Sequence, residues 1–147
     1  MFDSEAARKA VVLLVDDDPV NLRVLSKLLQ PEYEVLVAND GAAALHIAAS
    51  NPTPDIVLLD VQMPDIDGYA VCRRLKSDPA TRHIPVIFVT AKSTPDAEEY
   101  GLSIGAVDYV AKPFSPSAVR ARVRTQLRLR GLISELEGVN HSLIDRL

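Results

Sequence analysis

The sequence has only one cysteine, Cys72, among its 147 residues. A single cysteine excludes an intrachain disulfide and fits a reducing compartment, so we expect a cytoplasmic protein. No apolar run approaches the ~20 residues that a membrane-spanning helix needs. The first residues also lack the apolar core of a signal peptide. We therefore expect no membrane association.

Basic residues are in the minority, and they are unevenly placed. Residues 1–114 carry 10 basic and 17 acidic side chains, whereas residues 115–147 carry 6 and 3. An acidic body does not attract nucleic acid. The basic stretch could be read as the DNA-binding region of a basic zipper, but it must also pack on its own domain through Val119, Val123 and Leu127. We interpret its arginines as a solvated face or a contact with an acidic partner, and expect no direct nucleic-acid binding; they are Arg120, Arg122, Arg124, Arg128 and Arg130.

Hydrophobic residues make up 48% of the chain, which excludes a largely disordered protein. Short apolar runs alternate with segments of helical periodicity. The runs predict strands at 11–15, 33–38, 55–60, 85–90 and 107–111. Helices are predicted after Asp18-Pro19, over 42–50 and 69–76, from Thr94-Pro95 to about residue 104, and from Ser115-Pro116 onward. This alternation predicts a doubly wound α/β domain with a five-stranded parallel sheet.

Polar side chains follow the carboxyl ends of the predicted strands. Asp16 and Asp17 follow the first strand, Asp60 ends the third, Thr90 ends the fourth, and Lys112 follows the fifth. Ligands of open parallel sheets bind at this edge. Clustered carboxylates repel one another unless a cation intervenes, and oxygen ligands of this kind suit Mg²⁺.

Each of these residues also has a purely structural reading. Asp18 is better explained as the N-cap of the first helix, because Pro19 follows it. A single aspartate at a strand end is more often a turn or cap residue than a catalyst. Three acids at one edge are harder to explain in that way, since their mutual repulsion would cost stability. A carboxylate supported by a cation and a lysine could instead act as a nucleophile toward phosphorus.

Four segments occur in order and sample most of the span from Val11 to Arg128: LLVDDDPVN at 13–21, DIVLLDVQMPDIDGY at 55–69, IPVIFVTAK at 84–92 and GAVDYVAKPF at 105–114. Together they resemble the receiver domain of two-component response regulators. The resemblance implies a flavodoxin-like strand order of 2-1-3-4-5. It also implies a sensor histidine kinase or histidine phosphotransfer protein as the phosphoryl donor.

The resemblance assigns a role to each matching residue. Asp60 would accept the phosphoryl group, with Lys112 and Thr90 binding the phosphoryl oxygens. Mg²⁺ would be held by Asp16, Asp17, Asp60 and the backbone carbonyl of Gln62. Tyr109 would turn inward when Thr90 moves, changing the face formed by the fourth helix, fifth strand and fifth helix. Pro113 would follow Lys112 through a cis peptide bond. Asp65 and Asp67 are read as solvated turn residues.

The C-terminal segment continues the last helix with a short heptad pattern. The apolar positions of this pattern are Leu129, Leu132, Leu136, Val139 and Leu143. Two glycines, Gly131 and Gly138, weaken it. We therefore divide the chain into a leader at 1–10, a receiver at 11–128 and a helical extension at 129–147. The extension is read either as a signalling helix that forms a dimer and leads to an output domain, or as an amphipathic helix folded on its own domain.

Two other functions fit parts of the pattern. A metal-dependent phosphatase with an aspartyl nucleophile usually has a second aspartate two residues after the nucleophile, where this chain has Gln62. A receiver-like scaffold that is never phosphorylated would not need Asp16, Asp17, Asp60, Thr90 and Lys112 together. We therefore expect a phospho-acceptor signalling domain rather than an enzyme. Cys72 is expected to be a buried, inert thiol.

Overall fold

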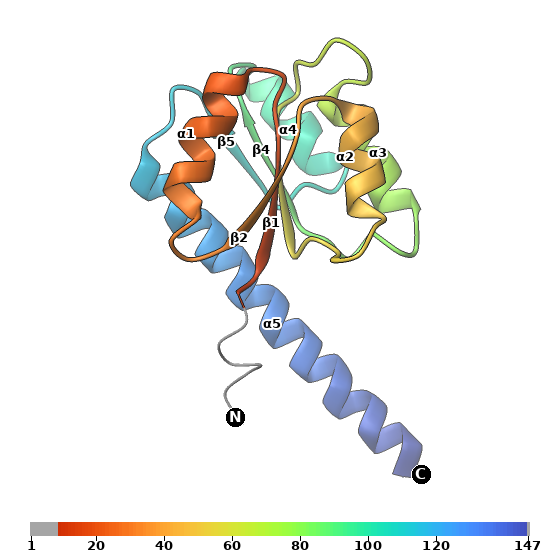
Figure 1. Ribbon diagram of the computed structural model, residues 1–147. Helices are drawn as coiled ribbons and strands as arrows, with labels where there is room; N and C mark the ends of the chain where they lie inside the picture. Colours follow the sequence, from red (N-terminus) through yellow and green to blue (C-terminus); the bar gives the residue numbers. More distant parts are fainter. Residues whose placement is uncertain (1–8, 147) are drawn as a thin grey trace.

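The computed structural model describes residues 9–146, with side chains described up to residue 133 and at Leu136. Five parallel strands form one sheet in the order β2-β1-β3-β4-β5, which confirms the expected topology (Figure 1). The strands are β1 (Val11–Val15), β2 (Glu34–Ala38), β3 (Ile56–Leu59), β4 (Val86–Thr90) and β5 (Asp108–Ala111). Their bounds lie within one residue of the predicted ones at each end.

Helices cover both faces of the sheet (Figure 1). Helices α1 (Pro19–Leu29) and α5 (Pro116–Arg146) pack on one face. The other face carries α2 (Gly41–Ala48), α3 (Gly68–Ser77) and α4 (Pro95–Ser103). Successive residues of β1 enter different cores, since Leu13 packs toward α2 and α3 while Leu14 packs toward α1 and α5. A strand buried on both faces needs the continuous apolar run that the sequence has.

Side-chain oxygens cap the helices that leave the sheet. Asp18 accepts a hydrogen bond from the Val20 amide at 2.9 Å, as its N-cap reading predicted. Asp40 and Thr94 cap α2 and α4 in the same way. Asp67 was read as a solvated turn residue, but its carboxylate accepts the Ala70 amide at 2.8 Å and caps α3. These caps fix where each helix begins relative to the strand before it.

Helix α5 extends well beyond the sheet (Figure 1). Its first part packs on the sheet through Val119 and Val123, as predicted. Beyond the sheet, Leu129, Leu132 and Leu136 are 46%, 51% and 63% exposed. Although α5 is long, no helix within residues 9–146 is both long and apolar enough to cross a membrane. The side chains of the remaining predicted heptad positions, and the leader before Lys9, lie outside the described part.

Candidate functional site

Three aspartates meet at the carboxyl edge of the sheet. Asp16 follows β1 and Asp60 follows β3, and these strands are neighbours with Val15 opposite Leu59. Carboxylate oxygens of Asp16, Asp17 and Asp60 all lie within 4.8 Å of one another. Asp16 and Asp60 are only 2% and 6% exposed, whereas Asp17 is exposed. The sheet therefore brings together the acids that the sequence marked.

Lys112 reaches into this group from the loop after β5. Its ammonium donates to Asp16 Oδ2 at 2.6 Å and to Asp60 Oδ2 at 2.9 Å. Burial alone would lower the pKa of Lys112, but its bonds to the two carboxylates raise the pKa above its ordinary value. Burial raises the pKa of Asp16 despite the bond from Lys112. The peptide bond between Lys112 and Pro113 is cis.

The backbone around Asp60 is tightly constrained. The Gln62 amide donates to Asp60 Oδ1 at 3.1 Å, while the Gln62 side chain is exposed. The loop closes with a bond from the Gly68 amide to the Val61 carbonyl at 2.8 Å. A Cβ atom on Gly68 would lie 2.1 Å from the Asp60 carbonyl oxygen, so only glycine fits at position 68. The orientation of Asp60 thus depends on the loop that follows it.

Thr90 and Tyr109 are joined through one residue. Thr90 is fully buried, and its Oγ1 accepts the Lys92 amide at 3.2 Å. The Tyr109 hydroxyl donates to the Lys92 carbonyl. The Tyr109 ring is 7% exposed and contacts the Phe88 ring at a centroid distance of 5.5 Å. Tyr109 therefore lies inward, and the backbone of Lys92 links it to Thr90.

Two side chains near the site have roles that the sequence reading missed. Asp65 is exposed in the loop after β3, as expected of a solvated turn residue, and its carboxylate also accepts the Gly41 and Ala42 amides, each at 3.1 Å. These bonds hold its pKa below the ordinary value, with the Gly41 bond the largest cause. The Tyr69 hydroxyl lies 3.2 Å from the Tyr109 hydroxyl. No local sequence signal could have predicted these contacts, since the partners lie 24 and 40 residues apart in the sequence.

The donor set suits a hard divalent cation. Three carboxylates face a single ammonium, so the group carries excess negative charge at neutral pH. Mg²⁺ prefers oxygen ligands and retains several waters, which the exposed Asp17 would permit. Buried Asp16 and Asp60 supply fixed oxygens for it. The residues present therefore fit a magnesium site that stays open on one side.

Doubly wound α/β domains bind their ligands where the strand order reverses, and in this chain that point lies between β1 and β3. The acids at this point suit a cation and a phosphoryl group rather than a pyrophosphate. The fold and the site together thus define the class of the chain, a flavodoxin-like domain whose ligand-binding edge is acidic. Within that class, the chain belongs to the response regulator receiver domain family, whose pattern matches residues 12–124. It is therefore a phospho-acceptor domain of two-component signalling, which implies a histidine kinase as a partner.

Relatives support the same family. The chain is 48% identical over 128 residues to the response regulator PleD of Caulobacter vibrioides. It is 44% identical over 124 residues to a Vibrio cholerae protein named "Probable cyclic di-GMP phosphodiesterase". These matches cover 86% and 84% of the chain, but only 28% of either relative. A response regulator structure from Chloroflexus aurantiacus superposes with a TM-score of 0.78 at 37% identity, covering 82% of this chain and 99% of that one.

Proposed function

We propose that Asp60 accepts a phosphoryl group from a phosphohistidine and that the domain passes the change on through Thr90 and Tyr109. One observation carries the proposal. Asp60 is a buried carboxylate that shares Lys112 with Asp16 and lies within the three-acid cluster. A buried acid held among like charges and one ammonium is typical of a functional site rather than of a stabilising ion pair.

The transfer requires one bond to form and one to break. An Asp60 carboxylate oxygen attacks phosphorus, the phosphorus–nitrogen bond of the donor breaks, and the electron pair returns to the imidazole. The Lys112 ammonium offsets negative charge on the phosphoryl oxygens, and the Thr90 hydroxyl donates to one of them. Mg²⁺, held by Asp16, Asp17, Asp60 and the Gln62 carbonyl, would supply further charge compensation.

The signal would leave the site through Lys92. A phosphoryl group on Asp60 adds about −1.5 to −2 charge and draws the Thr90 hydroxyl toward it. Because Thr90 Oγ1 accepts the Lys92 amide and the Lys92 carbonyl accepts Tyr109, movement of Thr90 disturbs the position of the Tyr109 ring. Such a contact biases an existing equilibrium between two arrangements of α4, β5 and α5.

The segments outside the site have proposed roles as well. We propose a cytoplasmic receiver at 11–128, a leader at 1–10, and an extension at 129–147 that links it to an output domain and forms a homodimer. Exposed Leu132 and Leu136, which do not line the cavity described below, support the dimer. The name of the Vibrio relative favours an output that acts on a cyclic dinucleotide. Within the cluster of five arginines at 120–130, four form ion pairs with carboxylates of this domain, which supports the absence of nucleic-acid binding; they are Arg120, Arg122, Arg124 and Arg130.

Intact-mass spectrometry after incubation with acetyl phosphate and Mg²⁺ tests the proposal. We expect one added phosphoryl group on the wild type and none on Asp60→Asn or in EDTA, because an amide is not a nucleophile toward phosphorus. Labelling retained in Asp60→Asn would place the acceptor elsewhere. If the wild type gains no mass, titration with beryllofluoride decides the matter: failure to bind it would favour the scaffold reading and overturn the proposal.

A further inference from the structure

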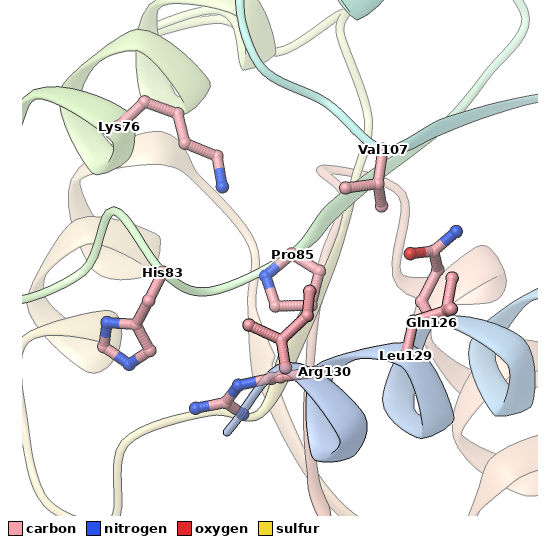
Figure 2. A pocket seen from close by; sticks show the side chains of 8 residues that line it. Lys76, His83, Pro85, Val107, Gln126, Leu129 and Arg130 are labelled. Atoms are coloured by element: carbon pink, nitrogen blue, oxygen red, sulfur yellow. The ribbon is translucent and has the colours of Figure 1, made fainter. Parts of the chain in front are cut away.

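A second site is indicated at the opposite end of the sheet from the aspartates. A cavity of about 460 Å³ lies where the strands β4 and β5 begin and α5 passes beyond the sheet (Figure 2). Pro85 and Val107, directly before the two strands, form one side, and Leu129 and Ile133 of α5 form the other. Small-molecule sites typically measure about 300–1,000 Å³ and have mostly apolar walls. The cavity has the size and the lining of such a site.

The apolar walls are uncovered. Val107, Leu129 and Ile133 are 41%, 46% and 55% exposed, although each is a large aliphatic side chain. They come from two segments far apart in sequence and line one cavity. Figure 2 shows Val107 and Leu129 of this lining. Covering this surface with an apolar ligand would remove it from water, which favours binding.

Lys76 supplies a charge to this apolar cavity. Its half-buried ammonium donates to the Ile84 carbonyl at 2.6 Å and to the Arg82 carbonyl at 3.1 Å, and Figure 2 shows it directed toward Pro85. Among the described residues, no carboxylate forms an ion pair with it. The two acceptors of the Lys76 ammonium are neutral carbonyls, and burial lowers its pKa. An ammonium has three donors, and two carbonyls leave one for a ligand.

Two other basic side chains line the cavity, Arg130 and His83, and both are already engaged. The Arg130 guanidinium pairs with Asp55 at 2.8 Å, and His83 also has a partner. Lys76, with one donor left, is therefore the anchor for a ligand among these residues, and one ammonium suits one carboxylate better than a multiply charged phosphate. We propose that this cavity binds a small amphiphilic carboxylate, with its apolar chain against Val107, Leu129 and Ile133 and its carboxylate on Lys76. The site is independent of the proposed phosphorylation at Asp60.

Isothermal titration of the full chain with octanoate and with 1-octanol tests the proposal, because the two ligands share a chain and differ in charge. We expect saturable 1:1 binding of octanoate, at least about tenfold tighter than that of octanol. Lys76→Met keeps the aliphatic stem and should abolish this preference. The control Lys27→Met, which removes an exposed lysine from α1, should leave it unchanged.

A second variant covers the case in which Lys76→Met fails to fold, since Lys76 also holds the loop through two carbonyls. Ile133→Asn changes an exposed wall residue and should weaken both ligands by a similar factor, while circular dichroism confirms the fold. The proposal is overturned if octanoate shows no saturable binding at millimolar concentration. It is also overturned if Ile133→Asn leaves both affinities unchanged, or if a folded Lys76→Met retains the preference for octanoate.

Discussion

The Arg130 guanidinium donates to both the backbone carbonyl and the side-chain carboxylate of Asp55, at 3.0 and 2.8 Å. Asp55 directly precedes β3, the strand whose other end leads to Asp60. The second carboxylate oxygen of Asp55 accepts the Val11 amide of β1 at 2.7 Å. A single carboxylate thus ties the extending part of α5 to the neighbouring strands β1 and β3.

The variant Arg130→Gln should free the extension without unfolding the domain. Both partners are partly exposed, so we expect the free energy of unfolding to fall by less than about 1 kcal/mol. Distances between spin labels at positions 23 and 136 should become more broadly distributed. The control Arg128→Gln, in an exposed arginine of the same helix, should leave the distribution unchanged. Equal distributions in both variants would show that the Asp55 contact does not fix the direction of α5.

Two glycine-to-alanine variants should have opposite effects. At Gly68 the new Cβ would meet the Asp60 carbonyl at 2.1 Å, so we expect a loss of about 2 kcal/mol or more and slower phosphorylation. At Gly131 a Cβ meets nothing within 4 Å, so alanine should stabilise α5 by up to about 1 kcal/mol. Denaturant unfolding measures both. A tolerated Gly68→Ala with wild-type phosphorylation would mean that the loop does not orient Asp60.

The sequence predicted the elements because their signals are local. The run at 11–15 is buried on both faces as its composition predicts, and Asp18 and Thr94 cap helices at the positions their sequence patterns indicate. The clustering of Asp16, Asp17 and Asp60 could be predicted from one general rule. The carboxyl ends of parallel strands lie at the same edge of the sheet. The strand order needed the family resemblance, because strand pairing depends on contacts between distant segments.

Contacts between distant segments explain what was missed. Asp65 binds the first turn of α2, 24 residues away, and Arg130 binds Asp55 across 75 residues. No spacing rule connects such partners, since both depend on how loops and helices lie in the finished fold. The cavity beside Lys76 was missed for the same reason, because its walls come from α3, α5 and the residues directly before β4 and β5.

Magnesium binding should depend on Asp17 but not on its neighbour Asp18. Asp17 contributes an oxygen to the acidic cluster, whereas Asp18 caps α1 through the Val20 amide. We expect Asp17→Asn to weaken Mg²⁺ binding at least about tenfold in isothermal titration, since a cation loses a charged ligand. Asp18→Asn should retain the affinity, because asparagine also caps helices. Similar losses in the two variants would contradict the assignment.

The Cys72 thiol should be unreactive in the folded protein. It is fully buried, and burial raises its pKa to about 11 from an ordinary value of 9.0. At pH 8 we expect iodoacetamide to alkylate it only after unfolding in urea, as measured by intact mass. Because the pKa is higher in the folded state, this thiol should reduce stability progressively as the pH rises from about 9 to about 11. Rapid alkylation of the native protein would show that α3 opens readily.

Tyr109→Phe should cost more stability than Tyr100→Phe. Tyr109 is buried, and its hydroxyl donates to the Lys92 carbonyl and lies 3.2 Å from the Tyr69 hydroxyl. Its removal deprives the Lys92 carbonyl of this donor and leaves the Tyr69 hydroxyl with only its bond to the Ala97 carbonyl. We expect a loss of about 1–2 kcal/mol in denaturant unfolding. Tyr100 is 42% exposed and accepts only a surface bond from Arg73, so Tyr100→Phe should lower the free energy of unfolding by no more than about 0.5 kcal/mol.

If Tyr109 couples to Thr90 through Lys92, the amide resonance of Lys92 should also shift in Tyr109→Phe and not in Tyr100→Phe. An unshifted Lys92 resonance would remove the physical basis for a switch along this route.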